Sequence, residues 1–229
     1  MSYEIRRYGD AVLKSEATPI TEIDGKLVRL VDDMYATLRT SGNGVALAAP
    51  QIGVQKQIFV WDLGDGEQDV VFNPEVVESD GEWVYEEGCL SIPGLYVEIV
   101  RPKTVLVRGV DLDGDEVEYE LDEFESRLFQ HEIDHLHGVL MFDRMTSDQR
   151  KEAMATYRQI VREGAESAAR PRTPDRRALR LPRRRPQPCA DRGNRRRGVL
   201  SRRDRRGDRP PCARKWRRHD GRRSCRVRA

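Results

Sequence analysis

The chain has 229 residues, 38% of them hydrophobic, which is enough to bury one sizeable core without a disulfide framework. No stretch approaches the roughly 18–20 consecutive apolar residues that span a bilayer, and the start lacks the apolar run of a secretory signal, so the sequence predicts a cytoplasmic protein without a membrane segment. The net charge of +2 hides a division, because residues 1–169 carry 16 basic and 34 acidic side chains, whereas residues 170–229 carry 25 basic and 5 acidic ones.

The first predicted element is an amphipathic helix that starts near Thr21 and can end at Gly42. Its apolar residues recur at helical spacing: Leu27, Leu30, Val31, Met34, Tyr35 and Leu38. A stretch of small residues follows, SGNGVALAAPQIG. Small residues let a backbone approach a ligand closely, and the amide of Gln51 can donate a hydrogen bond to a developing oxyanion. Taken alone, this stretch is explained better by tight packing than by a ligand site.

Short runs rich in Val, Ile and aromatic residues occupy Gln57 to Leu121 and predict antiparallel strands. Turn signals separate the runs, and one of them, DLDGDE, is typical of a hairpin tip rather than of a calcium loop. Between two of the runs lies EEGCLSIPG. Its Cys89 could present a thiolate to a metal, although a lone cysteine is more often a packed core residue.

Two further helices are predicted after the strands. One begins at Asp122, where Glu125 completes a capping-box pattern, and continues to Gly138. The other runs from Ser147 to about Ala169.

The first of these helices carries QHEIDHLHG, which contains three of the four histidines of the chain. Positions i and i+4 of a helix share one face, so His131 and His135 can bind the same divalent metal. Glu132 then lies beside a water at the metal, where a carboxylate can accept a proton and return it to a leaving amine. His137 falls off the ligand face and is assigned a surface or packing role. Metal-bound histidines need fixed partners, so supporting roles are assigned to two neighbours: Gln130 and Asp134.

A catalytic metal site needs a third protein ligand and an open position. A third histidine in an HExxHxxGxxH pattern is excluded, because Met141 stands in its place. The residues alone leave two alternatives, Cys89 or a downstream glutamate. The available glutamates are Glu152, Glu163 and Glu166.

Three segments resemble, in order and spacing, the three signature motifs of bacterial peptide deformylases, and the resemblance covers about residues 1–165. GVALAAPQ resembles GxGxAAxQ, EGCLS (Glu87 to Ser91) is identical to the second motif, and QHEIDHLHG matches QHExDHLxG. One position departs from the pattern, since Ala46 stands where the first motif has its second glycine. This position is close to where the peptide substrate of the family lies, so the fit of the substrate could change there.

The resemblance implies an α+β fold, in which antiparallel strands surround a central helix that carries HExxH and a C-terminal helix follows. It also implies the reaction, hydrolysis of the N-formyl group from the terminal formylmethionine of newly synthesised polypeptides with release of formate. Cys89 becomes the third metal ligand beside His131 and His135. Fe(II) is the metal that the family implies in the cell, with zinc, nickel and cobalt as alternatives.

The resemblance also assigns the remaining site residues and the partners. Glu132 is the acid/base, and the Gln51 side chain and the backbone N–H of Leu90 hold the oxyanion. The expected substrate-binding residues are Gly44, Val45 and Ala46. The expected partners are formylmethionyl nascent peptides and the ribosome near its exit tunnel, and the protein is expected to be a monomer.

Residues 170–229 differ from the predicted catalytic domain, residues 1–169. They contain 24 arginines, one lysine, no glutamate and almost no apolar periodicity, which predicts a disordered basic tail. One interpretation is an arm that binds ribosomal RNA. Translation of a GC-rich gene in a shifted reading frame is the other, and it fits the composition better.

Two rival functions come from different classes. A zinc peptidase would combine HExxH with a downstream glutamate and would keep its metal without Cys89. A catalytically inactive RNA-binding module would act through the basic tail. The intact Glu132 argues against such a module, because an inactive protein does not need an acid/base.

Overall fold

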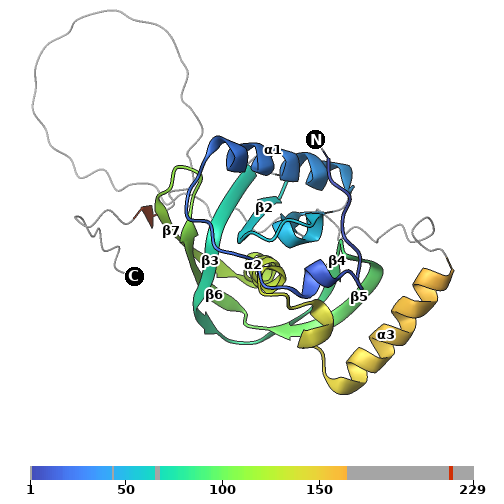
Figure 1. Ribbon diagram of the computed structural model, residues 1–229. Coiled ribbons are helices and arrows are strands. Elements are labelled where there is room, and N and C mark those ends of the chain that lie inside the picture. Colours follow the sequence, from blue (N-terminus) through green and yellow to red (C-terminus); the bar gives the residue numbers. More distant parts are fainter. Residues whose placement is uncertain (1, 43, 65–67, 164–216, 219–229) are drawn as a thin grey trace, which may run out of the picture. The chain divides into compact units, whose positions relative to one another are not determined.

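The computed structural model describes residues 2–42, 44–64, 68–163 and 217–218, and within them it contains two antiparallel sheets and three α-helices (Figure 1). The helices are α1 (Gly25–Thr40), α2 (Glu123–Leu136) and α3 (Ser147–Arg162), with 3-10 helices η1 (Ala11–Lys14), η2 (Ala49–Ile52) and η3 (Met141–Arg144). The strands are β1 (Ala46–Ala48), β2 (Ile58–Asp62), β3 (Gln68–Asp80), β4 (Trp83–Cys89), β5 (Ile92–Arg101), β6 (Thr104–Val110), β7 (Glu116–Asp122) and β8 (Arg217–Arg218). The predicted α+β class is confirmed.

The strands form one large sheet and one separate hairpin. The large sheet has the order β1-β2-β3-β6-β7-β8, and β4 pairs only with β5 among the described residues. β1 therefore lies at an edge of the large sheet, next to β2. The predicted hairpin tip between β6 and β7 is confirmed, because the Asp111 carboxylate accepts the backbone N–H groups of Asp113 and Asp115 there.

Helix α2 occupies the centre of this arrangement, as predicted. Every residue from Ser126 to Leu136 is buried, and Figure 1 shows α2 almost end-on with strands around it. A helix that is covered on all sides holds its side chains in fixed directions, because close packing leaves little room for other rotamers.

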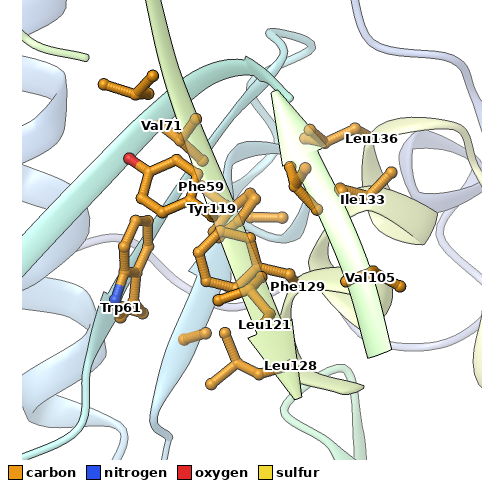
Figure 2. Close-up of a cluster of buried hydrophobic side chains, with 14 of the residues drawn as sticks. Phe59, Trp61, Val71, Val105, Tyr119, Leu121, Leu128, Phe129, Ile133 and Leu136 are labelled. Carbon is orange, nitrogen blue, oxygen red and sulfur yellow. The ribbon is translucent and has the colours of Figure 1, made fainter. Parts of the chain in front are cut away.

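An aromatic cluster anchors α2 against the large sheet (Figure 2). The ring of Phe129 from α2 lies 5.0 Å from that of Phe59, 4.8 Å from that of Trp61 and 5.2 Å from that of Tyr119, measured between centroids. Aromatic pairs at such distances add to the free energy of burial. The cluster therefore fixes the turn of α2 that directly precedes the histidines.

The helix boundaries differ from the predicted ones at three places. Helix α1 begins after Asp24 rather than at Thr21, because the Asp24 carboxylate accepts two of the first backbone N–H groups. Asp122 is the N-cap residue of α2, but its side chain makes no capping hydrogen bond, so the predicted capping box is wrong. Helix α3 ends at Arg162, before the predicted end at about Ala169, and residues 164–169 lie outside the described residues.

Two further predictions concern the C-terminal tail and membrane-spanning segments. The predicted disordered tail lies outside the described residues, except for the two residues of β8. Among the described residues, no helix is long and apolar enough to span a membrane.

Candidate active site

The three predicted metal ligands lie together. The ligand atoms of Cys89, His131 and His135 are all within 4.8 Å of one another, and the Cys89 sulfur is 3.2 Å from Nε2 of His135. The two imidazole rings are 4.9 Å apart between centroids, at 82° to each other. Helical i, i+4 spacing thus brings the histidines to one point, and the end of β4 brings the cysteine to the same point.

Cys89 reaches this point because the hairpin is irregular before it. The register of the β4–β5 pairing shifts between Gly88 and Cys89. A Cβ atom on Gly88 would lie 2.6 Å from the ring of Tyr96, so only glycine allows this close packing. The close packing against Tyr96 explains the glycine of EGCLS, and the register shift after this glycine positions the Cys89 thiol.

Glu87 orients the first histidine. Nδ1–H of His131 donates to the Glu87 carboxylate at 2.6 Å, which leaves Nε2 for the metal. Burial opposes the charge on Glu87, but the Arg101 guanidinium and His131 outweigh it and hold the pKa of this carboxyl well below its usual range. No role was predicted for Glu87, although its position two residues before Cys89 was a usable signal.

The donor set fits a divalent first-row metal. Neighbouring nitrogen and sulfur ligands of a tetrahedral ion are separated by about 3.5 Å, and the 3.2 Å between Cys89 Sγ and His135 Nε2 is close to this value. Burial opposes ionisation of the Cys89 thiol, but the imidazoles of His135 and His131 hold its pKa well below the usual value. A thiolate is the form that binds a metal. Two imidazoles and a thiolate leave a fourth position open, as a catalytic ion needs.

Glu132 lies beside this cluster, and its carboxyl group is buried. The residue is 4% exposed, and Oε2 has no hydrogen-bond partner among the described residues. Burial raises the pKa of Glu132 to about 7. A buried carboxyl with a pKa near neutrality can both accept and donate a proton.

Gln51 and Leu90 belong to different elements, the 3-10 helix η2 and the turn after β4. The side-chain oxygen Oε1 of Gln51 accepts the backbone N–H of Ala48 at 2.8 Å, which turns Nε2 toward Ser91 Oγ at 3.4 Å and Cys89 Sγ at 3.7 Å. Leu90 lies between Cys89 and Ser91 in the turn that joins β4 to β5. The amide group predicted to hold an oxyanion therefore faces the cysteine.

The N-terminal segment connects η2 to the turn between β4 and β5. The backbone N–H of Arg6 donates to the Gln51 carbonyl at 2.7 Å, and that of Tyr8 donates to the Ser91 carbonyl at 2.9 Å. The Arg7 guanidinium donates to the Leu90 carbonyl at 3.0 Å. No role was predicted for these residues, because they belong to no sequence motif.

The first motif forms the edge of the large sheet. A Cβ on Gly44 would lie 2.8 Å from the Leu90 side chain, so this glycine allows the first two motifs to pack closely. Ala46 lies in β1 and is 6% exposed, and its methyl group belongs to the aromatic cluster that anchors α2. The residue that departs from the family pattern therefore places its side chain in the core.

Other predicted residues lie outside the ligand cluster. Gln130 donates to the Pro102 carbonyl at 3.0 Å and to Ser126, and so supports the helix rather than a ligand. His137 caps the end of α2 and lies 3.6 Å from a Glu16 oxygen, in agreement with a surface role. Asp134 accepts hydrogen bonds from Arg101 and Arg144. Among the described residues the cluster contains no downstream glutamate; the candidates Glu152 and Glu163 are exposed, and Glu166 lies outside the described residues.

Comparisons with known proteins agree with this geometry. The family model described as polypeptide deformylase matches residues 2–151. The peptide deformylase of Halothermothrix orenii is 46% identical over 143 residues, which cover 62% of this chain and 92% of that protein. The crystal structure of the peptide deformylase from Thermus thermophilus is 39% identical, covers 72% of this chain and 99% of that one, and has a TM-score of 0.67. The corresponding values for the Legionella pneumophila peptide deformylase structure are 37%, 72%, 98% and 0.67. The chain belongs to the polypeptide deformylase family.

Proposed function

We propose that this protein hydrolyses the N-formyl group from the N-terminal formylmethionine of newly synthesised polypeptides and releases formate. The single observation that supports this best is the convergence of Cys89, His131 and His135 beside the buried carboxyl of Glu132. The family match over residues 2–151 contains all of these residues.

Each residue of the site has a role that its surroundings support. Cys89, His131 and His135 would hold a divalent ion, which would supply the Lewis acidity that makes water nucleophilic near neutral pH. Glu132 accepts the proton of the attacking water and delivers it to the leaving amine. The Gln51 amide and the backbone N–H of Leu90 stabilise the negative charge that develops on the formyl oxygen. Water thus adds its oxygen to the formyl carbon, the C–N bond breaks, and formate and a free amine leave.

The substrate backbone is proposed to lie along β1. This strand has a sheet neighbour only on the β2 side among the described residues, so its other edge can bind an extended peptide. Gly44 and Val45, which directly precede β1, and Ala46 then contact the substrate, and Ala46 does so through its backbone because its methyl group is packed in the core.

For the metal we propose Fe(II) in the cell, with zinc, nickel and cobalt able to replace it. Two imidazoles and a thiolate suit both zinc and ferrous iron, so availability decides as much as geometry does. The proposed setting is the cytoplasm, where nascent chains leave the ribosome. The proposed active form is a monomer in which residues 1–169 form the catalytic domain.

The decisive experiment is formate release from a formyl-Met-Ala peptide by protein purified without oxygen, with metal content measured on the same sample. Turnover with about one metal per chain is expected. A protein that binds metal but releases no formate would contradict the proposal. Cys89→Ala distinguishes the rival zinc peptidase, because this variant should lose its metal in a deformylase and retain it in a peptidase that uses a downstream glutamate.

A further inference from the structure

The metal ligands come from two separate elements that must be held against each other. Cys89 ends β4, whereas His131 and His135 lie on α2. Among the described residues, the β4–β5 hairpin shares no backbone ladder with the large sheet. The distance between the cysteine and the histidines therefore depends on contacts other than sheet pairing, among them the side chains that join the hairpin to α2.

Arg127 is the side chain of α2 that joins both strands of the hairpin. It lies one helical turn before His131, and its guanidinium donates to the carbonyls of Trp83 on β4 and Ile99 on β5, at 2.8 Å each. A third hydrogen bond, of 2.9 Å, goes to the Glu87 carboxylate. The guanidinium carbon also lies 5.1 Å from the centre of the Trp83 ring, a cation–π distance.

The same carboxylate connects Arg127 to the metal ligand. Glu87 accepts two hydrogen bonds from Arg101, both 2.7 Å long, and one from His131. Arg101 reaches on to Asp134 of α2 at 2.8 Å. Both oxygens of Glu87 are thus fixed, and the direction of the His131 ring is fixed with them.

Stability alone does not explain this buried cluster. Desolvation of buried charges offsets most of their attraction, so apolar residues of similar size could stabilise the fold as well. Nε of Arg127 also has no hydrogen-bond partner among the described residues, which adds a cost. The planar guanidinium instead fixes the position of the hairpin, since one side chain reaches acceptors on both β4 and β5 at fixed angles.

We infer that Arg127 is a positioning residue of the metal centre: it holds the hairpin with Cys89 and the Glu87 carboxylate against α2, so that the three ligands lie close together before an ion binds. This inference rests on the proposed ligand set. It predicts an effect on metal affinity, and this affinity can be measured without any assay of turnover.

The test measures the affinity of the full-length apoprotein for Co(II) and Zn(II) by competition with a chelator, in Arg127→Met and Arg127→Lys. Arg127→Met is expected to weaken binding by about tenfold or more, as loss of a partner behind a metal ligand typically does. Arg127→Lys retains the charge but cannot reach all three acceptors, so a smaller, several-fold loss is expected. Arg108→Met is the control, because Arg108 hydrogen-bonds Glu118 on the exposed face of β6 and β7 and should leave affinity unchanged.

A lower melting temperature with unchanged metal affinity would mean that Arg127 is only structural, and would overturn the inference. If Arg127→Met does not fold, Arg127→Lys decides, because unchanged affinity in that variant contradicts a positioning role. Cys89→Ala, measured alongside, distinguishes a wrong ligand set from a wrong role for Arg127. If it also binds metal like the wild type, the ligand set is wrong; if it loses the metal while both Arg127 variants keep wild-type affinity, only the inference about Arg127 fails.

Discussion

Glu132 is the residue whose replacement separates proton transfer from metal binding. Its carboxyl group is not one of the three ligands, and the change Glu132→Gln retains the size of the side chain. We expect this variant to keep its metal and to lose turnover by about 10²–10⁴-fold, the usual contribution of a positioned acid/base. Formate release and metal content on one sample measure both effects. Turnover within a few fold of wild type would contradict the assigned role.

Ala46, the residue that departs from the family pattern, allows a prediction about stability. The methyl group of Ala46 lies in the aromatic cluster. A glycine at this position would also give the unfolded chain more backbone freedom. Ala46→Gly is therefore expected to lower the free energy of unfolding by about 1–2 kcal/mol, from lost burial and added chain entropy. Denaturant unfolding measures the change. An unaltered midpoint would show that the methyl group makes no net contribution to the core.

At the scale of elements, the end of α2 explains the final glycine of QHEIDHLHG. Gly138 has φ +67°, and a Cβ on it would lie 2.8 Å from the backbone of Lys14. Gly42, after α1, has φ +82° but no atom near its missing Cβ, so it is a matched control. Gly42→Ala should cost about 1 kcal/mol, the strain of a left-handed alanine.

Gly138→Ala should destabilise the protein clearly more than that, because the Lys14 backbone must also move. The comparison of the two unfolding midpoints isolates the effect of the contact. Equal losses in the two variants would mean that the N-terminal segment yields without cost, and that the glycine is needed only for its backbone conformation.

The elements themselves were largely predictable from local patterns. The apolar spacing from Leu27 to Leu38 predicted α1, and alternating runs predicted the strands between residues 57 and 121, because both patterns arise within one element. The separation of β4 and β5 from the other strands was not predicted. Strand pairing depends on contacts between distant residues, and no local pattern records them.

The predicted site residues divide in the same way. Two ligands follow from the i, i+4 spacing of His131 and His135, whereas Cys89 required the family resemblance. Glu87, Arg101 and Arg127 were missed because charged residues in strands and helices normally face solvent. Their burial becomes understandable only when β4, β5 and α2 are seen together, since the partners are separated by up to 44 residues.

At the scale of the whole molecule, metal removal should weaken the fold, because the ion would join α2 to the hairpin. A ligand at a thousand times its dissociation constant stabilises the folded state by about 4 kcal/mol. The apoprotein should therefore melt about 10 °C below the metal-loaded protein. Thermal unfolding with and without a chelator measures this difference. Cys89→Ala is the control, and its melting temperature should not respond to added metal.

Deletion of residues 170–229 is expected to leave turnover unchanged. The family match ends at residue 151, and all proposed site residues precede that position. Residues 1–169 alone have a net charge of −18, so the truncated chain should also lose any affinity for RNA that the full chain has. Formate release and RNA binding at two salt concentrations test both statements. A large loss of turnover would show that the tail belongs to the working enzyme.

The contacts of Arg7 with Leu90 and of Cys89 with His135 also determine when the site can form during synthesis. They connect residues that are 83 and 46 positions apart in the chain. Closing such long loops costs chain entropy, and this cost is offset only when the core is complete. A nascent chain that has not yet reached His131 lacks two of the three ligands. A chain that is still incomplete at this point therefore cannot complete the ligand set, and the ion can bind in full only after His135 has been synthesised.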